Sequence, residues 1–517
     1  IGSASQTRTF GNGNTSLGHS SLETNAGPNN DYNTVVGHRA MEETGSNVSF
    51  NTIMGAGALQ FNDAVQYNVA IGSNAMNRCT SIVSTVAIGD SVLAFVGMNG
   101  TLPEHGQYNT AVGSKSMLRN TIGYANTSMG FHSLNNNTEG INNVSVGTNA
   151  LKTNTVGYAN VAIGTNAMEF NVNGLENVAV GQAALRNNSD GINNVAVGEQ
   201  ALYDNTSGYN NVAIGHQALL DNVEGNGNVA VGIGTLNHNL SSNNTAVGSY
   251  SLEGNEGGYD NSALGAESLY NNNVGTHNTA GGAFSLWSNT EGNYNTSFGN
   301  RALYANSTGG ENTGIGTFAG DDIIDNFGST FLGYDADAAP NNFPNVFYST
   351  AIGYGARVTA DQQIRLGTAS TGSIGGFQNW TNISDGRYKT NIQDNVPGIE
   401  FIKKLKPVTY HLNVDLINNE LKTSAQQSSR GVAKSSQVLS GFVAQDVEKA
   451  ANELGYSFSG VDKPTNENGM YGLRYAEFTV PIVKAIQEQQ AQIDALIQEN
   501  EKLKKLVETL LKNSENK

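Results

Sequence analysis

One short motif, repeated along most of the chain, constrains the fold more than any other feature of the sequence. The four residues Val212–Gly215 recur, with variation, 20 times between Thr15 and Gly353, and 14 of the 19 intervals are 17 residues long. Every copy ends in glycine, and asparagine precedes 17 of them. A fixed period of this size indicates a solenoid, in which each unit buries its apolar residues only by stacking on its neighbours.

Each unit predicts one β-coil. A helical repeat needs about ten or more residues at 3.6-residue spacing, whereas this unit offers a four-residue extended run, a glycine, an alanine-leucine pair and an Asn/Gly-rich return. Alternation directs Val212 and Ile214 to one side of the strand and Ala213 to the other. Gly215 supplies the corner that follows, because glycine adopts positive φ without steric cost.

Two further positions repeat together with the glycine. We expect Asn211 to stack on Asn194 and Asn228 in a side-chain ladder that also caps the turn. Four residues after the glycine comes leucine or methionine in the first 17 copies, for example Leu219. One coil buries too little apolar surface to offset the ordering of 17 residues, so we expect stacking of coils, together with association of several chains, to make up the difference. We predict that the Leu/Met position forms the face where chains meet.

The repeat resembles a known family. Its pattern, Asn-x-Val-Ala-Ile-Gly-x-x-Ala-Leu over roughly residues 10–355, is similar to the head repeats of trimeric autotransporter adhesins, which also occur in phage tail fibres. The resemblance implies a left-handed parallel β-roll and a homotrimer.

Composition excludes several partners. The formal charge of −17 with 14% charged residues describes a mildly acidic, Asn/Gly-dominated surface, which does not recruit nucleic acid or an anionic membrane. The sequence has no run of about 18 apolar residues, so we expect no membrane insertion. Cys79 is the only cysteine, which excludes an intrachain disulfide. Because the first residue is Ile1 rather than methionine, we expect a missing N-terminal region that attaches the fibre to a baseplate or tail component.

One insertion interrupts the repeat. Between Val86 and Thr110 the interval grows to 24 residues, so residues 95–107 must bulge from the coil. Long loops on a rigid scaffold often carry recognition. Pro103, Glu104 and His105 are therefore candidate receptor-binding residues, and an insertion without a role is the alternative.

The last repeats lose their regular pattern. The Leu/Met position becomes Gly320, Asp337 and Arg357 in the final three copies. The acidic residues 321, 322 and 325 lack the spacing of a calcium loop. We therefore expect a solvated loop there, with neither a metal site nor a cofactor. Residues 363–367 predict a last strand.

The chain changes character after this point. We predict domains at 1–367 (β-solenoid shaft), 368–383 (Gly/Ser-rich junction), 384–477 (α+β) and 478–517 (coiled coil). Within the α+β part, the pattern predicts helices at 399–405 and 444–454, strands at 408–412 and 441–443, and a linker or flexible loop at 423–437.

The last helix carries a heptad seam that another helix must cover. β-branched residues at one seam position with leucine at the other nominally favour a dimer, whereas the repeat family favours a trimer. We expect a trimer, because the shaft buries far more surface. The seam residues are Ile482, Ile486, Gln489, Ile493, Leu496, Asn500, Leu503, Val507 and Leu510.

One short stretch of the sequence contains candidate catalytic residues. Ser384 and Lys389 are a nucleophile and a plausible base in the run Ser-Asp-Gly-Arg-Tyr-Lys-Thr-Asn-Ile at residues 384–392, where the repeats give way to the α+β part. A serine with a lysine five residues on is by itself a weak signal. In a sequence of this composition a polar turn is the ordinary interpretation.

Motifs over nearly all of residues 384–517 resemble the autocleaving intramolecular chaperone domain of endosialidase-type phage tail spikes, which the myelin regulatory factor shares. They are Ser-Asp-x-Arg-x-Lys-x-Asn-Ile at 384–392, Leu-Lys-Pro-Val-x-Tyr at 405–410, Gly-Phe-Val-Ala-Gln-Asp-Val at 441–447, and Tyr475 before the coiled coil.

This resemblance implies a Ser-Lys dyad. Ser384 attacks a main-chain carbonyl, and Lys389 takes its proton once burial or neighbouring cations have lowered its pKa. We place the cleavage site between Ile383 and Ser384, with the next bond as the alternative. Asp385, Arg387 and Asn391 are the supporting motif.

The predicted fold class is thus mainly β: a parallel β-roll or β-solenoid of about 20 coils of 17 residues, trimeric, followed by a small α+β chaperone domain ending in a coiled coil. The expected function is a tail fibre of a phage or phage-like injection particle. It would bind a glycan or outer-surface protein on a bacterium and be located in a virion tail or extracellular appendage. The alternatives are a cell-surface trimeric adhesin and a glycan-degrading tail spike, which needs two convergent carboxylates.

Overall fold

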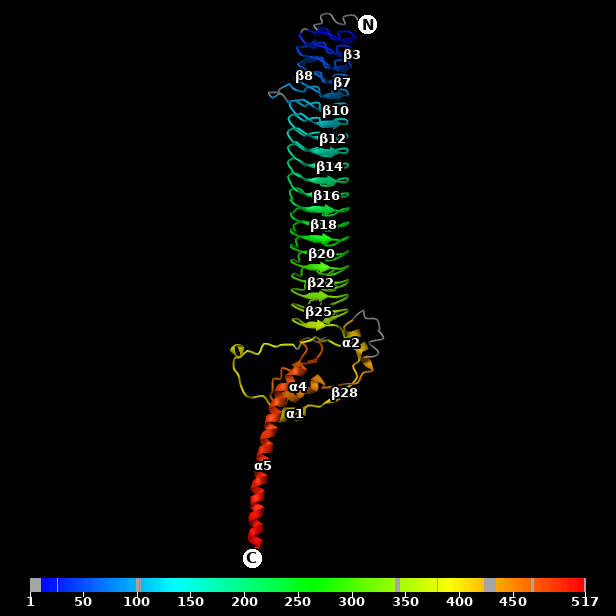
Figure 1. Ribbon diagram of the computed structural model, residues 1–517. Helices are drawn as coiled ribbons and strands as arrows, with labels where there is room; N and C mark the ends of the chain where they lie inside the picture. The colour runs from blue at the N-terminus through cyan, green and yellow to red at the C-terminus, as the bar shows by residue number, and fades with distance from the viewer. Residues whose placement is uncertain are drawn as a thin grey trace. The chain divides into compact units, whose positions relative to one another are not determined.

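The computed structural model describes residues 11–25, 27–98, 102, 104–339, 345–378, 380–422, 434–465 and 469–515. It confirms a mainly β protein, a parallel solenoid of about 20 turns with a C-terminal helix and small sheets (Figure 1). The chain divides into two compact units, residues 1–332 and 333–517.

The first unit is built on one parallel sheet to which each turn adds a three-residue strand. Its strands are β1 (Thr15–Leu17), β3 (Thr34–Val36), β5 (Thr52–Met54), β7 (Val69–Ile71), β9 (Val86–Ile88), β10 (Thr110–Val112), β11 (Thr127–Met129), β12 (Val144–Val146), β13 (Val161–Ile163), β14 (Val178–Val180), β15 (Val195–Val197), β16 (Val212–Ile214), β17 (Val229–Val231), β18 (Thr245–Val247), β19 (Ser262–Leu264), β20 (Thr279–Gly281), β21 (Thr296–Phe298), β22 (Thr313–Ile315) and β23 (Thr330–Leu332).

The strand alternation is as predicted, with the small residue inside. In β16, Ala213 is fully buried, whereas Ile214 is 40% exposed. Successive strands pair in register, so that Ala213 lies beside Ala196 and Ala230. An alanine ladder therefore lines the interior of the coil, and a row of larger apolar residues faces outward.

The Leu/Met position does not form an outer face, and this prediction was wrong. Leu219 and its equivalents are fully buried inside the coil of a single chain. The reason is a tight turn after the glycine, in which Gln217 and Leu219 both adopt positive φ, 56° and 53°. Positive φ is less stable than negative φ for a residue with a side chain. Burial of the leucine side chain offsets this strain.

The corner glycine is required by close backbone approach as well as by its φ of 138° at Gly215. A Cβ atom at this position would lie 2.3 Å from the carbonyl oxygen of Gly232 in the next turn. No side chain fits there, and a similarly close approach recurs at most other glycines of the motif, which explains why glycine recurs at this position along the chain.

Buried asparagines form two ladders. The predicted ladder runs through Asn194, Asn211 and Asn228, each of which bonds to the next turn. A second ladder lies in the return segment, where the amide of Asn205 donates to Asn188 at 2.8 Å and to the Gly208 carbonyl at 3.1 Å. Both ladders satisfy backbone groups that the turns leave inside the coil.

The first four turns carry an additional parallel sheet, formed by β2 (Thr24–Asn25), β4 (Glu43–Thr44), β6 (Phe61–Asp63) and β8 (Arg78–Thr80). The predicted insertion lies between β9 and β10, and its described residues lie at the side of the solenoid (Figure 1). Gly97 in this insertion donates to the Thr121 carbonyl at 2.6 Å and accepts from the Thr80 hydroxyl at 2.8 Å.

The second unit begins with the last turns and continues into the α+β part. Its strands are β24 (Asp337–Ala338), β25 (Thr350–Ile352), β26 (Arg357–Val358), β27 (Ile364–Leu366), β28 (Val408–Tyr410), β29 (Leu439–Gly441), β30 (Val461–Asp462) and β31 (Gly472–Leu473). Its helices are η1 (Gly386–Tyr388), α1 (Ile399–Lys404), α2 (Val414–Glu420), α4 (Ala444–Asn452), η2 (Tyr475–Phe478) and α5 (Thr479–Glu515).

The α+β part has its own core. Aromatic and small residues of α1, α4 and η2 pack together, and the rings of Phe401 and Phe458 meet edge to face at 5.1 Å. The predicted helices and the first strand are confirmed, while the second strand lies two residues earlier than expected, as β29. Residues 423–433 of the predicted linker lie outside the described residues. Helix α2 and the β30–β31 hairpin had no clear sequence signal.

In the last turn the Leu/Met position is occupied by Arg357, which forms a buried ion pair. Arg357 is 4% exposed and donates from its guanidinium to the Asp335 carboxylate at 2.5 Å. Arg357 also lies opposite Asp337 in the β24–β26 pairing. In the last two turns the position that holds leucine in earlier turns thus remains interior, and its occupants, Asp337 and Arg357, are charged.

Candidate active site

The two residues of the predicted dyad lie in contact in the single chain. The Lys389 Nζ donates a hydrogen bond to the Ser384 Oγ at 2.8 Å. The short helix η1 between them reverses the chain, which brings residues five apart in sequence into contact. Nucleophilic catalysis by a Ser-Lys pair needs these two atoms within hydrogen-bond distance, with the hydroxyl as the donor once the amine is neutral.

Asp385 fixes the turn that holds the dyad. Its carboxylate accepts from the Arg387 main-chain nitrogen at 2.9 Å, as the N-cap of η1, and from the Arg387 guanidinium at 2.6 Å. The hydrogen bond to Arg387 lowers the pKa of Asp385, and the same bond raises the pKa of Arg387. At the other end of η1 the Lys389 nitrogen donates to the Gly386 carbonyl at 3.2 Å.

The dyad is open to solvent in the single chain. Ser384 and Lys389 are both exposed, and the neighbouring Ile383 is 89% exposed. Asn391 of the supporting motif is also exposed and has a φ of 54°, beyond the turn that joins the dyad. The chain itself therefore supplies the contact between nucleophile and base but does not bury it.

Contacts that the sequence did not reveal hold the α+β part to the start of α5. Glu488 accepts from the main-chain nitrogen of Ile399 at 2.8 Å and so caps α1, and Lys484 pairs with Asp394 at 3.1 Å. The Tyr475 hydroxyl accepts from the Phe442 nitrogen at 3.1 Å, which links two of the quoted motifs. Tyr475 and Phe442 belong to the quoted motifs, whereas Ile399, Asp394, Lys484 and Glu488 are not part of them.

The candidate receptor-binding residues lie in the insertion. Pro103 is outside the described residues, while Glu104 and His105 are half-buried. The His105 Nδ1 accepts from the Leu102 nitrogen at 3.3 Å. This contact links Leu102 to His105 within the described part of the loop.

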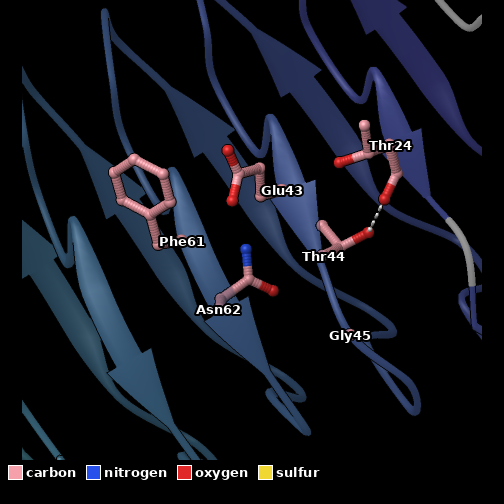
Figure 2. Close-up of a pocket in the computed structure, with 6 residues that line it drawn as sticks. All are labelled: Thr24, Glu43, Thr44, Gly45, Phe61 and Asn62. Carbon is pink, nitrogen blue, oxygen red and sulfur yellow. Dashed lines mark hydrogen bonds between the residues drawn. The ribbon is translucent and has the colours of Figure 1, made fainter.

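A surface hollow lies on the additional sheet of the first turns (Figure 2). The Thr44 hydroxyl donates to the Thr24 carbonyl at 3.2 Å across its floor. Its lining residues contain one carboxylate, whereas glycoside hydrolysis needs two. The lining residues are Thr24, Glu43, Thr44, Gly45, Phe61 and Asn62.

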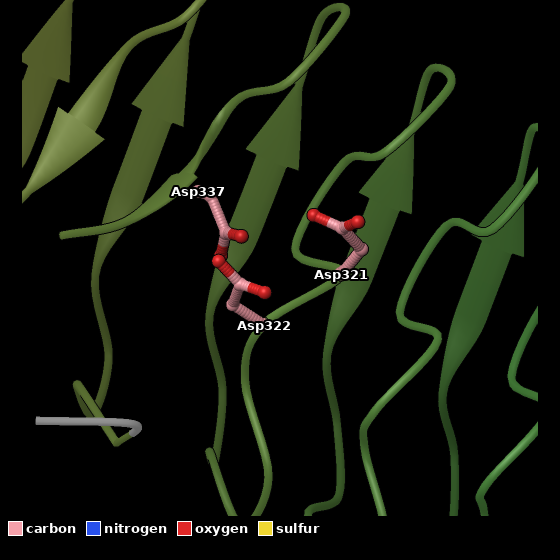
Figure 3. Close-up of side chains that lie close together, drawn as sticks. All are labelled: Asp321, Asp322 and Asp337. Carbon is pink, nitrogen blue, oxygen red and sulfur yellow. The ribbon is translucent and has the colours of Figure 1, made fainter. Parts of the chain in front are cut away.

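Three acidic side chains near the end of the repeats have oxygen atoms within 4.8 Å of one another, and Asp337 among them is buried. Asp321 is half-buried and Asp322 exposed in the segment after β22, and Figure 3 shows their side chains together with that of Asp337. The exposed Asp325 accepts from the Thr308 hydroxyl at 2.5 Å. An acidic cluster alone does not establish a metal site.

Aromatic side chains after the Leu position stack along the solenoid. The rings of Tyr270, Trp287 and Tyr304 lie parallel, with centroids 5.6 and 5.4 Å apart. The Arg301 guanidinium covers Tyr304 at 4.3 Å. Because neighbouring rings cover each other's faces, those inner faces are closed to a sugar.

Among the residues that the structure describes, no helix combines the length and apolarity needed to cross a membrane.

Comparison with known proteins identifies the domain that contains the dyad. None of the curated proteins compared with the chain matches it. Residues 384–456 match the family described as chaperone of endosialidase. The match begins at Ser384 itself and includes Lys389. It supports the resemblance seen in the sequence and, in general terms, a self-cleaving peptidase activity. The C-terminal part of this β-solenoid protein therefore carries an endosialidase-type chaperone domain, as in a tail-spike or tail-fibre protein.

Proposed function

We propose that the chain is a trimeric tail fibre of a phage or phage-like injection particle, whose C-terminal chaperone directs assembly and then cleaves itself off through Ser384 and Lys389. The observation that carries this proposal is the 2.8 Å hydrogen bond between Lys389 and Ser384 at the first residue of the chaperone match. That residue is also the boundary between repeats and chaperone, where a cut releases one from the other.

The chemistry is an attack within the chain. The Ser384 Oγ attacks the carbonyl carbon of Ile383, while Lys389 accepts the hydroxyl proton. The Ile383–Ser384 C–N bond breaks as the serine nitrogen is protonated, which leaves an ester between the two residues. Water then hydrolyses this ester, so that Ile383 ends in a carboxylate and Ser384 begins with a free amine.

Solvent exposure of the dyad explains how cleavage follows assembly. A lysine removes a proton only as a neutral amine, and desolvation or nearby cations favour that form. In the single chain Lys389 is exposed, so burial must come from partner chains. Cleavage then acts as a folding checkpoint, because only a correctly assembled molecule activates its base.

The shaft offers a surface for association. The third residue of many strands is a large apolar side chain that faces outward. A row of exposed apolar side chains of this kind is typical of a protein interface. Examples are Met129 (51% exposed), Ile163 (40%), Leu264 (59%) and Phe298 (46%).

Helix α5 favours three chains over two. Its seam residues are exposed, for example Ile493 (43%) and Leu503 (53%). Beside the seam, Ile497, Leu506 and Leu511 are also apolar and 52–61% exposed. An apolar stripe wider than the strict two-position seam suits a helix that contacts more than one neighbour.

A chaperone is needed because the repeats are nearly identical. A slip of one turn between chains costs little, and parallel pairing between distant residues forms slowly. A trimeric C-terminal nucleus sets the register before the shaft winds. Release of that nucleus leaves a fibre that is stable for kinetic reasons. We propose a glycan or outer-surface protein of a bacterium as the receptor.

Intact-mass analysis of the purified chain tests this function. Wild type should yield two fragments that meet at residues 383 and 384, whereas Ser384→Ala and Lys389→Ala should remain whole. The matched controls Ser373→Ala and Lys403→Ala change an exposed serine and lysine outside the dyad and should cleave like wild type. A trimeric wild-type chain that stays intact would show that the C-terminal domain is a permanent cap.

A further inference from the structure

Four large apolar side chains recur at every third residue directly before the cleavage site. They are Ile374, Phe377, Trp380 and Ile383, here called the tail row. In the single chain they are 60%, 107%, 88% and 89% exposed. The described residues of this segment, between β27 and Ser384, lie outside helices and strands.

The three-residue spacing of the tail row indicates a particular backbone conformation. A strand has a period of two and an α-helix one of 3.6, so a period of three fits neither. An extended left-handed chain has three residues per turn and rises about 3.1 Å per residue. In that conformation the four side chains would form a single stripe along one face of the segment.

Composition indicates which partner covers the stripe. From Gly367 to Ser384 the sequence contains no charged residue, although 14% of the whole chain is charged. A segment that meets its own copies around a symmetry axis places identical residues side by side, and like charges there are destabilising. Uncharged spacers and a stripe of apolar residues suit such self-contact.

Glycine spacers allow close approach. Gly375 and Gly376 separate Ile374 from Phe377, and a Cβ atom added at Gly375 would have nothing within 4 Å. The single chain therefore does not use these glycines for its own packing. They leave room for the backbone of another chain, as glycine does wherever chains approach closely.

We propose that residues 374–383 of three copies wrap around a common axis and bury the tail row, which then forms the C-terminal end of the mature fibre. This inference rests on the proposed trimer. After the Ile383–Ser384 bond is cut, the buried row would hold the three new chain ends together without the chaperone. A bacterial ligand on Trp380 is the competing occupant.

Fluorescence quenching tests the proposal, because Trp287 and Trp380 are the only tryptophans. In a Trp287→Phe chain, which keeps an aromatic ring in its stack, Trp380 reports alone. Acrylamide should quench Trp380 several-fold less in the cleaved fibre than in a peptide of residues 368–383. Light scattering on the same sample should give the mass of a trimer.

A matched pair of variants checks the row itself. In the Trp287→Phe background, Phe377→Ala should raise the quenching of Trp380, whereas Gln378→Ala, one residue off the row, should not. A trimer in which Trp380 is quenched as readily as in the peptide would overturn the inference and leave the trimer standing. A monomeric fibre would contradict the proposed trimer, and the tail-row inference would fail with it.

Discussion

The Asn194 side-chain oxygen accepts two hydrogen bonds from Asn211, one from the main-chain nitrogen at 3.0 Å and one from the side-chain amide at 3.1 Å. Asn211 in turn donates to the Gly225 carbonyl at 2.8 Å and accepts from the Asn228 nitrogen at 2.9 Å. One side chain thus satisfies polar groups of the turns on both sides of its own, all of them buried.

Asn211→Ala should therefore destabilise the shaft. The change removes the hydrogen bond of the buried Asn228 N–H and one of the two that the Gly225 carbonyl accepts, the other coming from Asn222. A buried group left unsatisfied costs about 1–3 kcal/mol. We expect a clear fall in the midpoint of denaturant unfolding. Glu224→Ala, which removes an exposed side chain in the same turn, should leave the midpoint unchanged. Equal midpoints for the two variants would contradict a structural role for the ladder.

Leu219→Ala tests where the Leu/Met position points. Because Leu219 is fully buried in the single chain, its truncation should cost about 2–5 kcal/mol of unfolding free energy. Leu240→Ala, at a residue 56% exposed, is the control and should have a much smaller effect. If Leu219→Ala instead dissociated the chains and left the fold of each chain unchanged, the interior placement would be wrong.

Some residues of this turn could be placed from the sequence, and one could not. Asn211, Ala213 and Gly215 could be predicted, because strand alternation and glycine geometry follow from local rules. The direction of Leu219 could not, since the turn that carries it inward uses positive φ at Gln217 and at Leu219 itself. Residues with side chains rarely adopt that conformation, so no propensity signals it.

In the candidate active site, too, the residues could be predicted but the contacts between distant segments could not. Ser384 and Lys389 were predicted from their resemblance to a family, and the contact between them depends on the η1 turn. The cap that Glu488 places on α1 joins residues 89 apart in sequence. No local pattern encodes such a contact.

The buried pair of the last turns should be sensitive to the loss of one partner. Arg357→Leu, which restores the residue type of earlier turns, should cost about 3–5 kcal/mol because it leaves the Asp335 carboxylate buried without its cation. The double variant Arg357→Leu with Asp335→Asn should recover part of this loss. A double-mutant cycle measured by denaturant unfolding gives the coupling. Additive effects would show that the pair contributes no net interaction.

Alkaline pH should weaken the aromatic stack. A hydrogen bond to Glu253, together with burial, raises the pKa of Tyr270 to about 12 from its ordinary value of 10. The neutral phenol is therefore favoured in the folded state. The stabilisation that the neutral Tyr270 side chain contributes is complete below pH 10 and is lost as pH rises toward 12.

Melting temperatures between pH 9 and 12 measure this effect. Wild type should lose stability more steeply than Tyr270→Phe, which has no proton to lose. The control variant Tyr209→Phe, at a tyrosine 49% exposed, should follow wild type. Parallel curves for wild type and Tyr270→Phe would show that Tyr270 does not contribute.

The proposed mechanism is tested most directly by measuring whether cleavage requires assembly of the chains. Leu503 lies in the α5 seam, and a charge there should prevent the helices from associating. Leu503→Asp and the control Lys502→Asp, one residue outside the seam, should be purified and followed by light scattering and intact mass. We predict that Lys502→Asp forms trimers and cleaves at residue 384, whereas Leu503→Asp remains monomeric and whole. A monomeric Leu503→Asp chain that still cleaves at this bond would contradict the account.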